Sequence, residues 1–300
     1  MEIKVVEAKE QYFDKLLCFY KTHYESSNRI FKNDYLKWLL LDNPNGSGQC
    51  VTVTLNDEII GNFFLVATSV TVNGVVKKGY FATDVLTHPE HRDKNLFVKM
   101  IRKSITYLKE EKKFIVGHPN KNAIPGWKRT KMEFGPEMSS FISKPKKPFS
   151  NIKIKELNTK KALFDLRCEV SDLINNSNDS IVNADVDYIY WRFLKHPNQK
   201  YIINAIYRNE CFCGLLVSMK YKGFVDRVIH YIADDKQISS VINSSLKPKI
   251  FYVPQSMAQS SYQNLLFKIN LGSNINFFIT NYDSDGKIDG KRISFAACDI

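Results

Sequence analysis

The segment over residues 80–100 combines groups that bind anions with the elements that would present them. Its apolar first part predicts a strand that ends at Thr87, and a proline turn and a polar loop follow. A helix is expected to begin near Leu96. A loop that leads into a helix N-terminus presents free backbone N–H groups and the positive end of the helix dipole, which together bind phosphate or pyrophosphate. Arg92 and Lys94 add positive charge at the same place, so the segment predicts a phosphate site.

The elements around this segment form part of an internal repeat. One constant offset of 153 residues relates two short apolar segments that each end at a proline. The matching pairs are Asp34 and Asp187, Tyr35 and Tyr188, Trp38 and Trp191, and Pro44 and Pro197. The same offset relates two turns, Asn56-Asp57 and Asn209-Glu210, each between two strand-like runs. Two aligned segments at one offset predict two copies of one fold, with the matching aromatic residues in the core.

Each copy is expected to run strand, helix, helix, hairpin, strand, helix, strand, helix, strand. This order predicts an α/β fold class with two mixed, mostly antiparallel sheets flanked by helices. In the first copy the expected strands cover residues 2–7, 50–56, 59–72, 76–87, 113–117 and 133–143, and the expected helices cover 9–24, 33–42, 96–110 and 121–131. A strand near 152–157 restarts the series. The charged, proline-bearing segment over 143–150 predicts a boundary between a domain over 1–145 and a domain over 146–300.

The composition agrees with a globular protein of this size. The chain has 300 residues, of which 44% are hydrophobic and 25% are charged, so a sizeable core can form. No stretch approaches the roughly 20 apolar residues of a membrane span, and the N-terminus carries no apolar leader. The six cysteines are scattered without a Cys-x-x-Cys pair, which disfavours a disulfide framework or a zinc site. We therefore expect a cytoplasmic protein without a membrane partner.

The net charge of +12 favours anionic partners. Nucleic acid, an anionic membrane surface and a phosphate-bearing small ligand would all fit, and a solvated lysine-rich surface would explain the charge equally well. The charge is diffuse, since Lys144, Lys146 and Lys147 form only a short basic run. Charge alone therefore does not choose among these partners.

The segment over residues 80–134 resembles the acyl-CoA-binding region of the GNAT (Gcn5-related N-acetyltransferase) superfamily. In that family a strand ends in a hydrophobic-x-Pro-x-x-Arg pattern, followed by Gly-x-Gly or Gly-x-Ala. The resemblance implies that loop amides hold the CoA pyrophosphate and that strand residues bond the pantetheine arm like an added strand. The loop residues are Arg92, Asp93, Lys94, Asn95, Leu96 and Phe97, and the strand residues are Val85, Leu86 and Thr87. The Pro119-Asn120 step resembles the next family motif, which implies that Asn120 contacts the CoA arm near its sulfur.

The sequence departs from the family pattern at four positions. Asn95 and Phe97 stand where the family has two small residues, and Glu133 replaces the glycine of the last turn. Asparagine tolerates left-handed backbone, so Asn95 can replace the first glycine, and Phe97 is expected on the inner face of the helix. Arg129 stands in place of the tyrosine that protonates the departing thiolate in the family. Either Arg129 binds a phosphate or the thiolate leaves without a dedicated acid.

Acyl transfer from a thioester to an amine needs a neutral amine and a polarised carbonyl. Asp84, one residue before the implied pantetheine ladder, is the leading candidate for the base that takes the ammonium proton, and His118 is the second. An ion pair for Asp84 and a packed imidazole for His118 stay open as structural roles. A backbone N–H near Leu86 could polarise the carbonyl. No further ligand has suitable spacing to His88 and His91, so no metal site is expected.

The second copy is expected to have lost the CoA site. Its interval between the long strand and the next strand is shorter than in the first copy, and residues 232–246 hold no Arg-x-x-small-x-small pattern. This copy would instead shape an acceptor pocket against the first, since ligand sites favour domain interfaces. Tyr190, Arg192 and Tyr252 are the candidates for acceptor binding, the first two because they break the chemistry of the repeat.

The layout as a whole resembles bacterial tandem-GNAT sugar N-acyltransferases of the FdhC type. The resemblance implies transfer of an acetyl or 3-hydroxybutyryl group from acyl-CoA to a nucleotide-linked amino sugar, such as a dTDP-3-amino-3,6-dideoxyhexose, for O-antigen or another surface polysaccharide. It implies no metal and no nucleic-acid partner, and a homodimer would be compatible with it. Two alternatives stay open. One is a Fem-type aminoacyl transferase that uses charged tRNA and shows salt-sensitive RNA affinity, and the other is a non-catalytic CoA-binding module.

Overall fold

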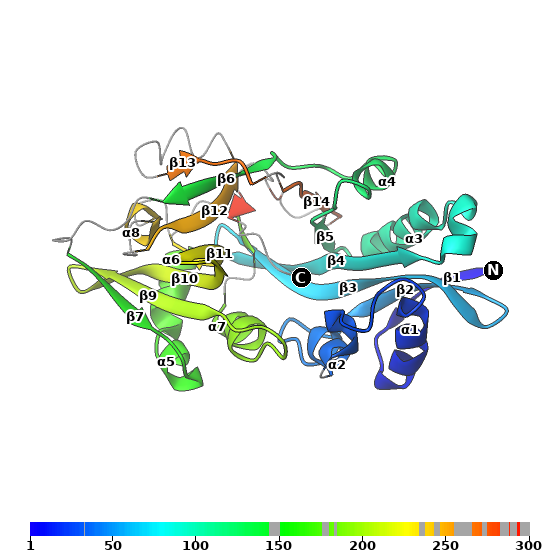
Figure 1. Ribbon diagram of the computed structural model, residues 1–300, viewed down its shortest axis with the longest axis horizontal. Coiled ribbons are helices and arrows are strands. Elements are labelled where there is room, and N and C mark those ends of the chain that lie inside the picture. Colours follow the sequence, from blue (N-terminus) through cyan, green and yellow to red (C-terminus); the bar gives the residue numbers. More distant parts are fainter. Residues whose placement is uncertain are drawn as a thin grey trace. The chain divides into compact units, whose positions relative to one another are not determined.

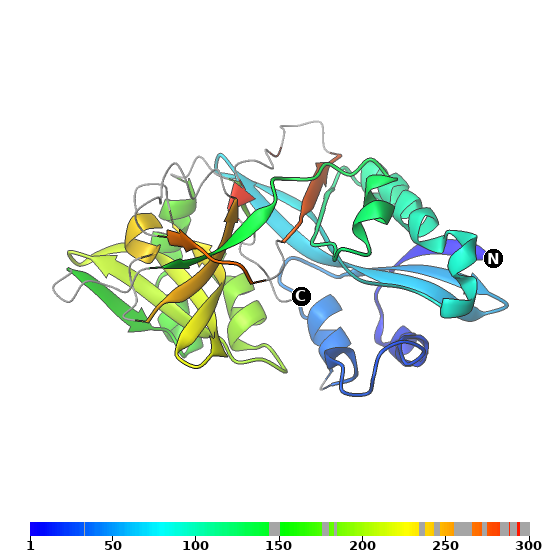
Figure 2. The same ribbon diagram turned by 45° about the horizontal axis from the view of Figure 1, so that its top comes forward.

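The computed structural model describes residues 1–32, 34–143, 151–175, 180–182, 185–233, 238–242, 247–254, 266–271, 275–282, 288 and 293–294. The chain divides into two compact units (Figures 1 and 2). The first unit comprises Met1–Ser69, Lys77–Gly135 and Phe277–Ile288, and the second comprises Val70–Val76, Pro136–Asn276 and Asp289–Ile300. Each unit is built on a mixed sheet flanked by helices, which confirms the predicted fold class. Most of the expected linker, residues 144–150, lies outside the described residues.

The sheet of the first unit contains both parallel and antiparallel pairs. Its strands run in the order β1-β2-β3-β4-β5-β14, and the pair β4–β5 is parallel whereas β1–β2, β2–β3 and β5–β14 are antiparallel. The strands are β1 (Glu2–Glu7), β2 (Gln49–Leu55), β3 (Glu58–Val72), β4 (Val75–Thr87), β5 (Phe114–Gly117) and β14 (Phe278–Asn281). Two short strands, β8 (Ser180–Val182) and β15 (Ile293–Ser294), continue the hydrogen bonding from Val70 and Thr71 at the far end of β3.

Helices cover both faces of this sheet. In Figures 1 and 2, α1 (Phe13–Tyr20) and α2 (Tyr35–Leu40) lie on one face, and α3 (Leu96–Glu110) and α4 (Ile124–Lys128) lie on the other. Short 3₁₀ helices precede α1, α2 and α3, and they cover Glu10–Tyr12, Arg29–Phe31 and Pro89–Lys94. The helix expected over 121–131 is shorter than predicted, because it contains Pro125 and Gly126, which are poor residues for a helix interior.

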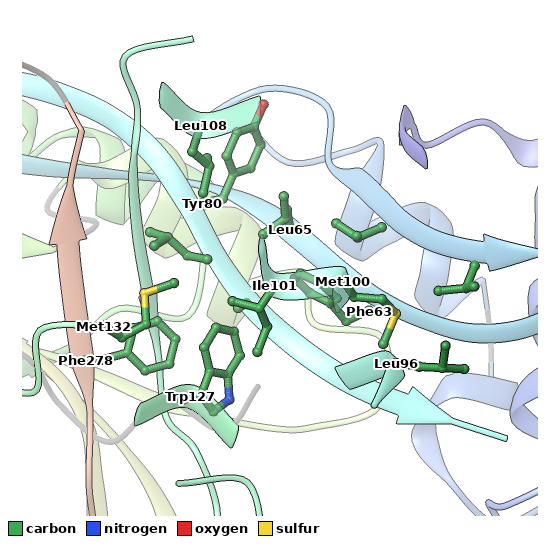
Figure 3. Close-up of a cluster of buried hydrophobic side chains, with 14 of the residues drawn as sticks. Phe63, Leu65, Tyr80, Leu96, Met100, Ile101, Leu108, Trp127, Met132 and Phe278 are labelled. Carbon is green, nitrogen blue, oxygen red and sulfur yellow. The ribbon is translucent and has the colours of Figure 1, made fainter. Parts of the chain in front are cut away.

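The core of the first unit lies between the sheet and α3 (Figure 3). Helix α3 contributes an apolar stripe of residues about three to four apart, as expected for a helix that buries one face. This stripe packs on Phe63 and Leu65 of β3, while the rings of Trp127 and Phe278 lie 4.3 Å apart and extend the core to α4 and β14. The stripe consists of Leu96, Met100, Ile101 and Leu108. Helix α3 is thereby fixed on the sheet, and its N-terminus is held beside the end of β4.

The sheet of the second unit repeats the same plan. Its strands run in the order β13-β6-β12-β11-β10-β9-β7, and β11–β12 is its parallel pair. The strands are β6 (Met138–Ser143), β7 (Ile152–Glu156), β9 (Ile202–Arg208), β10 (Cys211–Lys222), β11 (Val225–Ile232), β12 (Lys249–Pro254) and β13 (Leu266–Lys268). The helices are α5 (Lys160–Phe164), α6 (Arg167–Asn175), α7 (Val186–Ile189), a π-helix at Tyr190–Leu194 and α8 (Ile238–Ile242). Between the parallel strands, α8 has 5 residues where α3 has 15.

The predicted repeat is confirmed at the level of backbone detail. The Asn56-Asp57 and Asn209-Glu210 turns both have positive φ at their two central residues, which matches the right-handed twist of a tight hairpin. Each hairpin then carries a bulge one residue before a glycine, between Ile59 and Gly61 in β3 and between Phe212 and Gly214 in β10. The ring pairs Tyr35–Trp38 and Tyr188–Trp191 have the same centroid separation of 5.4 Å, and all four rings are buried.

The two halves of the chain exchange one strand each. The strand expected over 133–143 forms as β6, but it pairs with β12 of the second unit instead of completing the first sheet. The place beside β5 is taken by β14, from near the C-terminus. The division into units therefore does not follow a single cut near residue 145. Strand patterns in a sequence indicate which segments are extended, but the partner of an edge strand depends on long-range packing.

Candidate active site

The junction between the loop and α3 has the backbone geometry of an anion site. Asn95 ends the 3₁₀ helix at Pro89–Lys94 and begins α3 with φ 54° and ψ 35°, a left-handed conformation. This confirms the expectation that Asn95 can take the place of a glycine here. The Asn95 side chain makes no capping hydrogen bond to the helix. The first N–H groups of α3, which have no acceptor within the helix, are therefore left for a ligand.

Phe97 is turned away from this junction. Its ring meets the Trp127 ring edge-on at a centroid distance of 5.7 Å, and it fills the space beside Gly126. A β-carbon on Gly126 would lie 2.4 Å from Cε1 of Phe97, so the absence of a side chain at Gly126 makes room for the ring. Phe97 stands where the family motif has its second small residue, and its ring packs against α4 and not against the loop.

Charged and polar side chains surround the loop. Arg92 and Asp93 are exposed, and the Lys94 Nζ lies 3.0 Å from Nδ1 of His91. The His88 ring accepts a 3.4 Å hydrogen bond from the Glu90 N–H, which explains this histidine as a cap of the loop. No group of three or more histidine, cysteine, aspartate or glutamate residues that could hold a metal ion occurs in the described part of the chain.

Strands β4 and β5 separate at one end. Their parallel pairing stops at Ala82 and Gly117, while β4 continues as far as Thr87. On its other side β4 stays attached to β3, because the His88 N–H donates to the Ile60 carbonyl at 2.9 Å. The predicted pantetheine residues, Val85, Leu86 and Thr87, all lie beyond the last β4–β5 pair. An extended ligand could add there as a strand.

Asp84 lies within this unpaired stretch and has unusual backbone. Its φ is 50°, which is left-handed conformation inside a strand. Its side chain is 11% exposed, Oδ1 lies 3.7 Å from Nη2 of Arg29, and Oδ2 accepts a hydrogen bond from the Thr83 hydroxyl at 3.2 Å. Burial raises the pKa of Asp84 above its ordinary value, and the Arg29 guanidinium opposes this rise. A carboxyl group whose pKa is shifted by burial and by a specific charged partner is a candidate functional group.

A buried polar chain that the sequence analysis did not identify leads to the backbone of Asp84. The Tyr20 hydroxyl donates to the Asp84 carbonyl at 2.7 Å and accepts from Nδ2 of Asn62 at 3.0 Å. The Thr52 hydroxyl donates to Oδ1 of Asn62 at 2.8 Å. The sequence did hold a signal, because Asn62 interrupts an apolar strand, and a buried amide must find hydrogen-bond partners.

His118 and Asn120 follow β5 on the other side of the gap. His118 is half-buried, and its ring lies 5.7 Å from the Phe81 ring and 6.4 Å from the Phe277 ring. The last β4–β5 pair joins Ala82 to Gly117. Asp84 follows this pair on β4 and His118 follows it after β5, so both base candidates lie where the two strands separate. Asn120 is exposed, and its Oδ1 accepts from the Ala123 N–H at 2.9 Å.

The three acceptor candidates lie in the second unit. The Tyr190 ring packs edge-on against the Phe164 ring, and Lys160 Nζ lies 5.2 Å from its centroid. Arg192 is only 1% exposed. Tyr252 is also buried, and the Arg227 guanidinium carbon lies 5.9 Å from the centroid of its ring.

Comparison with known proteins finds a match to one family model in the first part of the chain. Residues 4–125 match the family model described as an acetyltransferase (GNAT) domain. The matched range runs from β1 to the first residues of α4, and it includes the loop, α3 and the gap between β4 and β5. The chain is an acyltransferase enzyme, and a domain of this kind implies binding of acyl-CoA.

Solved structures share the fold over nearly the whole chain. A protein of unknown function from Enterococcus faecalis V583, described as a probable N-acyltransferase, has a TM-score of 0.67 at 10% identity and covers 94% of this chain and 73% of its own. A GCN5-related N-acetyltransferase from Anabaena variabilis ATCC 29413 has a TM-score of 0.65 at 8% identity with the same coverage. A tandem GNAT protein from the clavulanic acid biosynthesis pathway has a TM-score of 0.55 at 6% identity and covers 95% of this chain and 100% of its own.

These likenesses support the fold and not a substrate, because the identities are low. They agree with the tandem arrangement that the repeat predicted. No curated protein matches the sequence. Among the described residues, no helix combines the length and the apolar character that crossing a bilayer requires.

Proposed function

We propose that the chain transfers an acyl group from acyl-CoA to an amine, with the CoA bound by the first unit. The observation that carries this proposal combines two features of the first unit. Asn95 has left-handed backbone at the start of α3, and the end of β4 after Ala82 is not paired with β5. The first feature suits a pyrophosphate and the second an extended pantetheine arm. The two features are adjacent in the chain, as one ligand that carries both groups requires.

This geometry supports the following binding roles. The N–H groups at the start of α3, with the Arg92 side chain, hold the pyrophosphate, and Asp93, Lys94 and Leu96 shape the loop around it. Val85, Leu86 and Thr87 pair with the pantetheine arm, and Asn120 contacts that arm from the β5 side. Phe97 does not obstruct the loop, since its ring packs on α4.

The chemical step needs a base and an exit for the thiolate. Asp84 takes the proton from the acceptor ammonium, directly or through a water, and the neutral amine attacks the thioester carbonyl carbon. The C–N bond forms, the C–S bond breaks, and the CoA sulfur leaves with the electron pair. The thiolate then takes up the second proton of the attacking nitrogen, so the products are the amide and the CoA thiol. His118 is the second candidate for the base. Arg129 is exposed, and its positive charge would stabilise a nearby thiolate or phosphate without donating a proton.

For the acceptor we propose a nucleotide-linked amino sugar, such as a dTDP-3-amino-3,6-dideoxyhexose destined for surface polysaccharide. The net charge of +12 supports two substrates that each carry a diphosphate. Tyr190 and Tyr252 remain the candidates for contact with this acceptor, whereas Arg192 is too deeply buried for that role.

A thiol-release assay tests both parts of the proposal. Acetyl-CoA and 3-hydroxybutyryl-CoA are each combined with a panel of nucleotide-linked amino sugars, and free thiol is measured against a control with the corresponding nucleotide sugars that lack an amine. Release only with an amino sugar supports the whole proposal. Release with other amines would retain the acyltransferase and reject the sugar. Absence of release and of CoA binding would reject the CoA-dependent reaction.

A further inference from the structure

We infer that Tyr20 is a positioning residue of the acyltransferase site, because its hydroxyl fixes the peptide group that follows Asp84. The inference rests on the proposed function, since this peptide group matters only if the thioester binds along β4. Tyr20 is the last residue of α1 and is fully buried, as is Asn62 on β3. It therefore acts on the strand from the helix layer and does not touch the substrates.

The hydrogen bonds that meet at Tyr20 have a defined direction. The amide nitrogen of Asn62 can only donate, so the Tyr20 oxygen is the acceptor of that 3.0 Å bond. The Tyr20 proton is consequently directed at the Asp84 carbonyl, 2.7 Å away. The Asn62 amide is itself oriented, because its oxygen accepts the 2.8 Å bond from Thr52. The three side chains thus form a relay that ends on one backbone carbonyl.

This carbonyl lies at the irregular point of the strand. Asp84 has φ 50°, a conformation that is strained for a non-glycine residue and persists only where the surroundings enforce it. In a regular strand the carbonyl would bond the neighbouring strand, but here the Tyr20 side chain takes that role. The relay is therefore one of the contacts that hold the left-handed turn.

The planarity of the peptide bond transmits this constraint. In a trans peptide the C=O of one residue and the N–H of the next point in opposite directions. When Tyr20 holds the Asp84 carbonyl, the Val85 N–H must point away from α1. Val85 is the first residue of the proposed pantetheine ladder. The Tyr20 hydroxyl thus determines the direction of the first N–H that the thioester arm meets.

Two further observations fit a fixed donor. Burial raises the pKa of Tyr20 well above its ordinary value, so the hydroxyl keeps its proton throughout the working pH range of an enzyme. The Tyr20 ring is also held by neighbours, with centroids 5.6 Å from Tyr24 and 5.5 Å from Phe64. Removal of the hydroxyl alone should therefore leave the ring in place.

The test compares Tyr20→Phe with a matched variant, Tyr107→Phe. Tyr107 lies near the end of α3, where its hydroxyl lies 3.3 Å from that of Tyr80, so the control also removes one hydroxyl. Thiol release from acetyl-CoA is measured with the acceptor amine that the panel identifies, and CoA affinity is measured by calorimetry. We expect kcat of Tyr20→Phe to fall by about tenfold to a hundredfold, the scale of a small misplacement, while the CoA Kd changes less than about twofold. Tyr107→Phe should keep the wild-type kcat.

The outcomes separate the two levels of the proposal. Absence of thiol release and CoA binding in the wild-type protein would reject the proposed function. Wild-type activity with an unchanged kcat in Tyr20→Phe would reject the positioning role alone. If Tyr20→Phe does not fold, as judged by circular dichroism, Thr52→Val tests the same relay from its other end. A lowered kcat with unchanged CoA affinity would support the relay, and a wild-type kcat would overturn it.

Discussion

Phe97 on α3 and Gly126 on α4 are packed so closely that the glycine leaves no room for a β-carbon, which would lie 2.4 Å from the Phe97 ring. In most helices a change from glycine to alanine is stabilising, because alanine has the higher helix propensity. Here the same change would force the ring out of its contact with Trp127. The pair explains how a large residue fits at the start of α3 without blocking the loop.

Gly126→Ala should therefore destabilise the protein, by about 1–3 kcal/mol as for other overpacked cores. Phe97→Ala removes the ring, and in that background Gly126→Ala should be neutral or stabilising. Thermal unfolding of the wild type, both single variants and the double variant measures this coupling. Additive effects would show that the two residues do not compete for the same space.

Arg92→Glu should weaken CoA binding by about tenfold or more. Hydrogen bonds to charged groups contribute about 1.5–3 kcal/mol, and the variant replaces a cation with an anion beside a diphosphate. Calorimetric titration with CoA measures the Kd. Arg208→Glu is the matched control, since Arg208 is an exposed residue of β9 in the second unit and its variant makes the same change in net charge. An equal loss in both variants would point to general electrostatics and not to the loop.

Asn95 provides a test of the backbone at the same junction. Its φ of 54° suits glycine and disfavours β-branched residues. Asn95→Gly should keep CoA affinity within about twofold, whereas Asn95→Val should lose stability by roughly 1–3 kcal/mol and lose CoA affinity. Unfolding midpoints and calorimetry on both variants measure these effects. An affinity loss in Asn95→Gly equal to that in Asn95→Val would assign a role to the amide side chain instead.

The pH dependence of the reaction should report on Asp84. Because burial raises the pKa of this carboxyl, the acid limb of kcat/KM should lie above the ordinary carboxyl range, with activity rising as Asp84 loses its proton. Asp84→Asn should remove this limb and lower kcat/KM by about 10²–10⁴-fold. Arg29→Gln should move the limb to higher pH, since Arg29 opposes the rise. A limb that persists in Asp84→Asn and disappears in His118→Gln would assign the base to His118.

The same carboxyl makes a prediction for stability. A group whose pKa is raised by folding binds protons more readily in the folded state, so its ionised form opposes folding above the raised pKa. This unfavourable contribution declines as the pH falls through the raised value and is absent below the ordinary one. The unfolding midpoint of Asp84→Asn should therefore equal or exceed that of the wild type at neutral pH, and the difference should shrink on acidification. A growing difference at low pH would contradict the burial of an ionised Asp84.

Residue types and spacings that act over a few positions allowed the turns and the bounds of α3 to be predicted from the sequence. Asn56-Asp57 and Asn209-Glu210 are residue pairs that accept left-handed turns, and both form them. The expected α3 over 96–110 has the bounds of the observed helix, because its apolar spacing is regular and Asn95 marks its start. Short-range signals of this kind determine turns, helix ends and strand faces.

Features that depend on contacts between distant parts of the chain could not be predicted from the sequence. The Asp84 carbonyl accepts a hydrogen bond from Tyr20, which is 64 positions away in the sequence, and nothing adjacent to Asp84 indicates its left-handed backbone. The positions of β6 and β14 likewise depend on which edge each strand meets in the folded chain. For the acceptor contacts the repeat could only indicate where the two copies differ, and Arg192 shows that such a difference can lie in a buried position.

The exchange of β6 and β14 has a consequence for synthesis in the cell. The neighbour of β5 (Phe114–Gly117) is encoded much later in the sequence, at Phe278–Asn281, so the first sheet cannot be completed until that segment has left the ribosome. At about 5–20 residues per second this delay lasts on the order of ten seconds. During that time the outer edge of β5 offers unpaired N–H and C=O groups to other nascent chains, and we expect chaperone dependence to be concentrated there.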